Sequence, residues 1–220
     1  MFLFVKYPAA GEVKTRLATE LGTGVAVELY RNFILDTLYT LKLLKIFFRI
    51  CYYPSFAEGK LVEWLGKQYS YMPQLGVDLG ERMKNAFLNG FDENLGRIVV
   101  IGSDSPDLPA DFLMEAFIAL ESHDVVVGPS SDGGYYLIGF SKNRFLSEAF
   151  ENIGWGGNSV FEQTVDILRK CRRSLYLLPQ WYDVDTAADL NDLVARNRDT
   201  AFHRSKTFAC ALEKVGTITQ

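Results

Sequence analysis

The stretch that most constrains this chain runs from Ile98 to Leu108, where a short apolar run ends abruptly in acid, turn and proline. β-Branched residues dominate the apolar part, which is typical of a strand covered on both faces, as in a parallel sheet. Pro106 ends this strand, and the helical spacing of apolar residues begins again at Leu113. We therefore expect a buried strand, a short loop and a helix.

Two aspartates follow this strand, and the local pattern explains them differently. In open α/β sheets, ligands bind just outside the carboxyl ends of the strands, so Asp104 lies where chemistry usually happens. Asp104 caps nothing obvious and is a candidate functional carboxylate, although a role in the turn also explains it. Asp107 is explained fully as the N-cap of the following helix, whose first turn would hold Pro109. We predict that Asp107 is structural.

The alternation of strand-like and helix-like segments predicts an α/β fold with a mixed, mostly parallel sheet between helices. At 220 residues, the chain has the length of one domain. The sequence Asp-Gly-Gly at 132–134, flanked by apolar residues, also predicts a hairpin turn. Strands are predicted at 2–6, 46–53, 69–72, 98–102, 124–129 and 174–178, and helices at 25–44, 59–66, 110–120, 159–171 and 187–195, with a further helix ending near 91.

Charge and composition exclude several classes of protein. The net charge of −4 argues against non-specific attraction to nucleic acid or to a membrane surface, because both need a basic face. The apolar stretches are too short, or too often interrupted by lysine and arginine, for a signal peptide or a membrane span, so we expect a cytoplasmic protein. The three cysteines lie far apart and predict neither a disulfide framework nor a zinc site.

The loop after the first strand carries a second informative pattern. Gly11 provides turn chemistry, and Lys14 and Arg16 flank Thr15 where a helix could begin. A loop of this kind could bind phosphates, because it offers two cations, a hydroxyl donor and backbone amides. The loop is not of the Walker type, because Val13 stands where that motif requires glycine. A surface loop with solvated charges explains the same residues.

Four later segments contain further candidates. Arg82 lies in the first turn of a predicted helix, where a cation opposes the helix dipole unless an anion is near, such as a ligand or a neighbouring carboxylate. Tyr135 follows two glycines, whose backbone a ligand can approach closely. Trp155 lies among glycines, an arrangement poor for core packing and suited to a lid or a sugar platform. The helix cap near 186 explains neither Asp183 nor Asp185.

Taken together, five motifs resemble those of a known bacterial family. They are Lys6-x-Pro8-x-x-Gly11-x-x-Lys14-Thr15-Arg16-Leu17, DLGERM at 78–83, GSDSPDL at 102–108, DGGYY at 132–136 and DVDT at 183–186. The family is that of the small bacterial glycosyltransferases of the nucleotide-diphospho-sugar transferase superfamily, relatives of the guanylyltransferases of molybdenum-cofactor and coenzyme F420 synthesis. The resemblance covers roughly residues 1–195 and implies a Rossmann-like fold of the glycosyltransferase A type. It implies one such domain over residues 1–198, followed by a helical tail, residues 199–220.

The resemblance also implies roles for particular residues. Asp104 would hold a divalent metal, Mg²⁺ or Mn²⁺, with Asp185 as the second ligand and Asp183 as a weaker candidate. Lys14, Arg16 and Asp104 would act in catalysis, since cations and a metal neutralise charge that builds on phosphates. The residues expected to bind the nucleotide are Lys6, Gly11, Lys14, Thr15, Arg16, Arg82 and Ser103. The residues expected to face the sugar or the acceptor are Asp132, Gly133, Gly134, Tyr135 and Trp155.

Two positions depart from the family pattern. Ala10 stands where the family commonly has proline, and Trp155-Gly156-Gly157 stands where a threonine is common. These departures concern the shape of the loops and the choice of acceptor, and they leave the nucleotide site as predicted.

Three functions remain open at this point. The first is metal-dependent transfer of a glycosyl group from a nucleotide-diphospho-sugar to a small acceptor. The second is nucleotidyl transfer from a nucleoside triphosphate to a phosphorylated small molecule with release of pyrophosphate, which the cationic loop favours because it would stabilise the α-phosphate in flight. The third is a nucleotide-binding module without turnover. The expected partners are therefore a nucleotide sugar or nucleoside triphosphate and a small acceptor, without nucleic acid or membrane, and a homodimer remains open.

Overall fold

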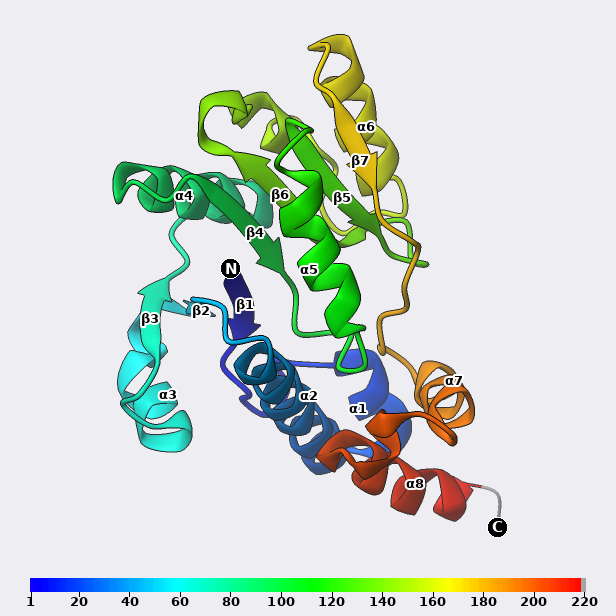
Figure 1. Ribbon diagram of the computed structural model, residues 1–220. Helices are drawn as coiled ribbons and strands as arrows, with labels where there is room; N and C mark the ends of the chain where they lie inside the picture. The colour runs from blue at the N-terminus through cyan, green and yellow to red at the C-terminus, as the bar shows by residue number, and fades with distance from the viewer. Residues whose placement is uncertain (219–220) are drawn as a thin grey trace.

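Seven strands form one mixed sheet in the order β3-β2-β1-β4-β6-β5-β7 (Figure 1). The computed structural model describes residues 1–218, and side chains as far as residue 214. Within that part of the chain, β6 alone runs antiparallel to its neighbours, β4 and β5. The strands are β1 (Phe2–Lys6), β2 (Arg49–Tyr53), β3 (Ser70–Pro73), β4 (Arg97–Ile101), β5 (Val125–Pro129), β6 (Tyr135–Ser141) and β7 (Leu175–Leu177).

Helices cover both faces of this sheet. Because successive side chains of a strand point to opposite faces, Phe2 and Phe4 of β1 join one core, whereas Leu3 and Val5 join the other. One core packs against α4 (Leu79–Asp92), η3 (Ser147–Phe150) and α6 (Val160–Lys170). The other packs against α1 (Thr15–Leu21), α2 (Thr23–Leu43), α3 (Glu58–Leu65), α5 (Ala110–Ala119), α7 (Ala187–Asn197) and α8 (Lys206–Ile218). Short 3₁₀ turns are η1 (Ser55–Ala57), η2 (Lys142–Arg144) and η4 (Ala201–Arg204).

The predicted α/β domain with a mixed, mostly parallel sheet is confirmed, and so is the order of the predicted strands and helices. One boundary was predicted too early, since the second strand begins at Arg49 and not at 46. Lys45 adopts a left-handed conformation, with φ of 53°, after α2. Pairing with β1 then starts where Arg49 lies opposite Phe2.

The strand directions bring distant loops to one edge of the sheet. Strands β1, β4 and β5 run in parallel, so the loops after their carboxyl ends emerge together. Because β6 is reversed, its first residue, Tyr135, lies at this same edge. The predicted hairpin is present, since residues 130–134 connect β5 to β6.

The chain after α7 returns to pack beside α2. The buried carboxylate of Asp36 in α2 accepts hydrogen bonds from the backbone amides of Lys206, at 3.2 Å, and Thr207, at 2.7 Å, at the start of α8. These bonds satisfy amides that lack partners within the helix. The last two residues of the predicted tail, 219 and 220, lie outside the described residues. No helix in the described part combines the length and hydropathy needed to cross a membrane.

Candidate active site

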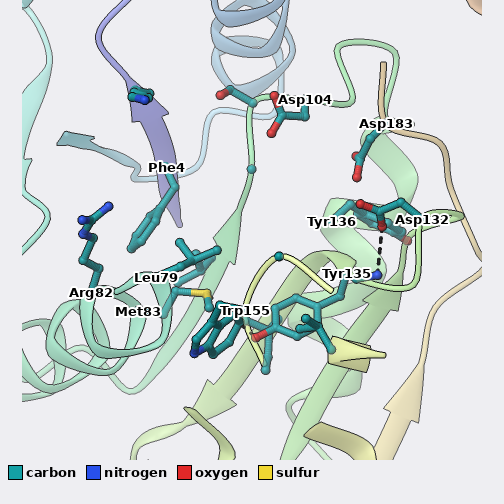
Figure 2. A pocket seen from close by; sticks show the side chains of 18 of the residues that line it. Phe4, Leu79, Arg82, Met83, Asp104, Asp132, Tyr135, Tyr136, Trp155 and Asp183 are labelled. Carbon is teal, nitrogen blue, oxygen red and sulfur yellow. Dashed lines mark hydrogen bonds between the residues drawn. The ribbon is translucent and has the colours of Figure 1, made fainter. Parts of the chain in front are cut away.

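A cavity of about 770 Å³ opens at the edge of the sheet where β1 and β4 end. Figure 2 shows that its two ends differ: Asp104 and Asp183 lie together at one end, whereas Met83, Tyr135 and Trp155 lie at the other. We call the first the acidic edge, which consists of Asp104, Asp183 and Asp185 with Lys14. We call the second the apolar end, which consists of Phe4, Leu79, Met83, Tyr135 and Trp155.

The side chain of Lys14 joins two carboxylates that are far apart in the sequence. Its Nζ lies 2.5 Å from Oδ1 of Asp104 and 2.8 Å from Oδ1 of Asp185. The Lys14 side chain is 3% exposed, whereas those of Asp104 and Asp185 are 48% and 40% exposed. Burial by itself lowers the pKa of Lys14, but the two carboxylates outweigh this effect and raise the pKa above its usual value. The ammonium is therefore charged at neutral pH.

Two aromatic rings of α2 lie beneath this ammonium. Nζ of Lys14 is 5.6 Å from the centre of the Phe33 ring and 6.0 Å from that of Tyr30, within the range of cation–π attraction. The Tyr30 hydroxyl shares a 2.8 Å hydrogen bond with the buried Ser103 and accepts one from the Lys6 amide at 3.0 Å. Burial raises the pKa of Tyr30 to about 12, so its hydroxyl stays neutral. Ser103, a predicted nucleotide ligand, thus has its hydroxyl engaged by α2.

Asp183 differs from the other two aspartates of the acidic edge. Its two oxygens accept hydrogen bonds from the hydroxyls of Ser105, at 2.5 Å, and Ser130, at 2.6 Å. Burial and the neighbouring Asp104 raise the pKa of Asp183 to about 6. Because hydroxyls already engage both oxygens, Asp183 is less available to a cation than Asp104 and Asp185.

The prediction that Asp107 caps the following helix is wrong. The N-cap position of α5 is Pro109. The Asp107 carboxylate, 1% exposed, accepts hydrogen bonds from Nε and Nη2 of Arg196 at 2.7 and 3.1 Å. Asn197 donates a further bond at 2.7 Å and Trp181 one at 3.2 Å. An ion pair with a helix more than eighty residues away outweighs local capping, and sequence spacing cannot reveal it.

Asp107 therefore helps to join the two segments that supply the acidic edge. The amide of Val184 donates a 3.0 Å hydrogen bond to the carbonyl of Asp104, beside the Ser105–Asp183 contact. At the start of α7, the predicted capping box of Thr186 and Asp189 is present. Hydrogen bonds at several points thus fix the positions of Asp104 and Asp185 relative to each other.

Arg82 lies away from the acidic edge, on α4. Its guanidinium is 3.7 Å from the centre of the Tyr53 ring, and its Nε donates to the carbonyl of Gly76 at 3.1 Å. The neighbouring carboxylates are engaged elsewhere, because Asp78 caps α4 and Glu81 accepts from the Val77 amide. Arg82 and Tyr53 both line the cavity. Sequence reasoning missed Tyr53, whose only signal was its place at the end of a buried strand.

Trp155 packs more closely than predicted. Figure 2 shows its indole between α4 and Tyr135, and the two rings meet edge to face at 6.5 Å. A Cβ at Gly80 would come within 2.4 Å of the indole Nε1 and 2.5 Å of the Phe150 carbonyl, so only glycine leaves room for the ring there. The expectation of poor core packing is wrong, because a glycine on another element makes the necessary space. Trp155 still lines the cavity.

The hairpin contributes the remaining predicted residues. Asp132 accepts a 2.8 Å hydrogen bond from the Gly134 amide (Figure 2). Gly133 has φ of 90°, and a Cβ there would lie 1.9 Å from the Asn158 carbonyl, so the hairpin fits closely against the Trp155 loop. Tyr136 is buried, and its hydroxyl donates to the Pro179 carbonyl at 2.9 Å.

The predicted site residues thus fall into three groups. Lining the cavity are Lys6, Arg16, Arg82, Ser103, Asp104, Asp132, Gly134, Tyr135, Trp155 and Asp183. Lys14 and Asp185 join the site through their ion pairs. Gly11 and Thr15, both exposed, and Gly133 are not among the lining residues. Residues that sequence reasoning missed include Phe4, Tyr30, Tyr53, Gln74, Leu79 and Met83, whose apolar, aromatic or amide side chains carry no functional signal by type.

The fold and cavity define a protein with the nucleotide-diphospho-sugar transferase fold. A crystal structure described as a "putative nucleotide-diphospho-sugar transferase" from Desulfovibrio desulfuricans G20 has a TM-score of 0.96 and 43% identity, covering 100% of this chain and 96% of that one. The chain belongs to the family described as "Uncharacterized protein conserved in bacteria (DUF2064)", whose model matches residues 37–157. The predicted resemblance to this superfamily is thereby confirmed.

A more distant structure shares the fold alone. The inositol-1-phosphate CTP transferase from T. maritima has a TM-score of 0.57 and 14% identity, and the alignment covers 96% of each chain. Among curated protein sequences, none matches this chain.

Proposed function

We propose that this protein is a metal-dependent transferase that uses a nucleotide-diphospho-sugar and moves the glycosyl group to a small acceptor. The observation that carries the proposal is the pairing of Lys14 with Asp104 and Asp185 at the mouth of a cavity whose other end is apolar. A charged edge suits a diphosphate, and an apolar wall suits a sugar or acceptor ring. The description of the 43% identical relative supports the same class of substrate.

The donor set of the acidic edge fits a divalent metal. Asp104 and Asp185 converge on a single cation, the ammonium of Lys14, and both are partly exposed. The described residues contain no cluster of three or more His, Cys, Asp or Glu side chains suited to a metal. Mg²⁺ commonly needs only one or two carboxylates, because substrate phosphates and water complete its coordination. We propose Asp104 and Asp185 as the ligands of Mg²⁺ or Mn²⁺, which would supply Lewis-acid stabilisation of the phosphates.

The cations of the first loop would act on the leaving group. As the bond to the sugar breaks, negative charge builds on the nucleoside diphosphate. Lys14 lies beside the proposed metal ligands, and Arg16 lines the cavity from the first turn of α1. Both can neutralise that charge without moving a proton. Arg82, stacked on Tyr53, would contact the nucleotide from the opposite side.

The apolar end would hold the sugar or the acceptor. Aromatic faces bind the C–H faces of sugar rings, and Trp155 and Tyr135 supply two rings at right angles. Asp132 lines the same cavity and can accept a hydrogen bond from a hydroxyl. An acceptor with hydroxyl groups and an apolar face therefore suits this end.

Nucleotidyl transfer is the second candidate. The loop cations Lys14 and Arg16 would stabilise the α-phosphate of a nucleoside triphosphate equally well. The inositol-1-phosphate CTP transferase, which shares the fold, is named for this chemistry. The acceptor of that reaction would carry a phosphate, whereas the apolar end offers mainly uncharged side chains. This contrast favours glycosyl transfer.

The identity of the leaving group tests the proposal. The protein is incubated with Mg²⁺, a panel of small acceptors and either nucleoside triphosphates or nucleotide sugars, and the released phosphates are measured. Release of a nucleoside diphosphate from a nucleotide sugar is the expected result. Release of pyrophosphate from a triphosphate would establish the second candidate instead. Nucleotide binding with neither product would leave a non-catalytic binding module.

A further inference from the structure

The position of Lys14 has a consequence for the proposed metal. Its ammonium contacts one oxygen of Asp104 and one of Asp185, the same two groups that are proposed as metal ligands. The side chain is almost wholly buried, and the rings of Phe33 and Tyr30 lie below it. A cation already occupies the place where the two carboxylates converge.

The backbone conformation at Lys14 contributes to this placement. Lys14 has φ of 47° and ψ of 49°, a left-handed conformation that is unfavourable for residues other than glycine. The chain adopts it directly before α1, where it directs the lysine toward the carboxylates that follow β4 and β7. Strain of this kind persists only where the surroundings enforce it.

We propose that Lys14 is an internal counter-ion that competes with the divalent metal for Asp104 and Asp185, so that the metal binds only together with the nucleotide. This inference rests on the proposed function, because it takes the same carboxylates as the metal ligands. Without phosphates, the ammonium neutralises both carboxylates and a metal would have to displace it into an apolar surrounding. A bound diphosphate gives the ammonium another anion and gives the metal further oxygen ligands.

This competition couples the two ligands thermodynamically. If the nucleotide raises the affinity for the metal by some factor, then the metal raises the affinity for the nucleotide by the same factor. Lys14 supplies a physical origin for that factor, since each ligand favours the arrangement in which the ammonium has left the carboxylates. The protein would thereby avoid holding a metal ion in a site without substrate.

Binding of Mn²⁺ alone, measured by electron paramagnetic resonance of the free ion in the absence of nucleotide, tests the inference. Lys14→Met removes the ammonium and keeps an apolar side chain over the two rings. We expect this variant to bind Mn²⁺ at least about tenfold more tightly than the wild type, which is a coupling of ordinary size. The double variant Lys14→Met/Asp185→Asn should lose the gain. Lys14→Gln provides a second variant if the methionine variant does not fold.

Two matched controls separate direct competition from a general change of charge. Lys84→Met removes a lysine with its own ion pair to Glu151, outside the cavity lining, and should leave Mn²⁺ affinity unchanged. Arg16→Met removes a cation that lines the cavity, and its effect should be smaller than that of Lys14→Met. Equal gains in Lys14→Met and Arg16→Met would overturn the inference.

The outcomes also distinguish this inference from the proposed function. If Lys14→Met binds Mn²⁺ no more tightly than the wild type, competition is excluded, even where the wild type releases a nucleoside diphosphate from a nucleotide sugar. If the gain appears but the wild type turns over no nucleotide sugar, the competition stands and glycosyl transfer is rejected. A gain that survives Asp185→Asn would place the metal elsewhere and would also overturn the inference.

Discussion

The acidic edge and the apolar end border one cavity but are built in different ways. At the acidic edge, side chains from three loops are held by ion pairs and hydrogen bonds, among them Lys14–Asp104, Lys14–Asp185 and Ser105–Asp183. At the apolar end, Trp155 and Tyr135 are held by packing, and a glycine in α4 makes the space for the indole. Polar pairs have fixed partners and directions, whereas packed rings are sensitive to volume. The two ends should therefore respond to different kinds of substitution.

The largest effect is expected where the acidic edge is anchored. Asp107→Ala would leave Arg196 without its buried partner, and loss of one member of a buried ion pair costs about 3–5 kcal/mol. Denaturant unfolding would measure the change. Asp78→Ala is the control, because Asp78 is an ordinary N-cap and its loss should cost only about 1 kcal/mol. Equal losses in the two variants would show that the Asp107–Arg196 ion pair contributes no more to stability than an ordinary N-cap.

Asp104→Asn tests the acidic edge itself. The amide keeps the size of the side chain but removes the charge that faces Lys14 and the proposed metal. We expect turnover to fall by roughly 100-fold or more, because transition-state charge stabilisation of this kind is commonly worth that much. Steady-state kinetics measures the change, and circular dichroism checks that the fold is intact. Full activity in a folded variant would remove Asp104 from the mechanism.

Gly80→Ala tests the apolar end by volume alone. The added methyl group would collide with the Trp155 indole and with the Phe150 carbonyl, and overpacking of this kind typically costs about 1–3 kcal/mol. The displaced indole should raise the KM for the acceptor. The affinity for the nucleotide should change less. Gly59→Ala in α3 is the matched control, since a Cβ there meets nothing within 4 Å. An unchanged acceptor KM in the Gly80 variant would show that Trp155 does not contribute to acceptor binding.

A smaller effect than at Asp107 or Asp104 is expected at Arg82, which lies on α4 away from the acidic edge. Arg82→Met would remove a cation that is stacked on Tyr53, and a hydrogen bond from such a group is worth about 1.5–3 kcal/mol. Nucleotide affinity should fall by about tenfold or more, and the KM for the acceptor should stay the same. Calorimetric titration measures nucleotide affinity in Arg82→Met and in the control Lys84→Met. The control removes a lysine of the same helix that is paired with Glu151. A change in the acceptor KM alone would show that Arg82 acts on acceptor binding and not on nucleotide binding.

Most of the fold could be predicted because its signals are local. Alternating strand-like and helix-like patterns, separated by prolines and glycines, mark the segments that form strands and helices. The buried run before Asp104 forms β4, as predicted. The capping box at Thr186 and the hairpin at 132–134 were predictable for the same reason. The late start of β2 was not, since the pairing partner in β1 decides where a strand begins.

The candidate site was only partly accessible to such reasoning. The residue types of Asp104, Lys14 and Asp185 indicated charge chemistry at loops that follow strands, and the structure joins the three. Nothing local revealed that Asp107 would bind Arg196, or that Gly80 would receive the Trp155 ring. Both contacts join residues about 70 to 90 positions apart, and only long-range packing decides which of many chemically suitable partners meet.

The amino-acid sequence by itself determined the class of fold and which residues could carry charge to one edge of the sheet, because these depend on periodicity, turn residues and residue type. Only the tertiary structure decided that Lys14 lies between Asp104 and Asp185, and that a glycine on α4 makes room for Trp155. The reason is physical. An ion pair or a close contact depends on the relative position of two elements, and that position is an outcome of packing the whole chain.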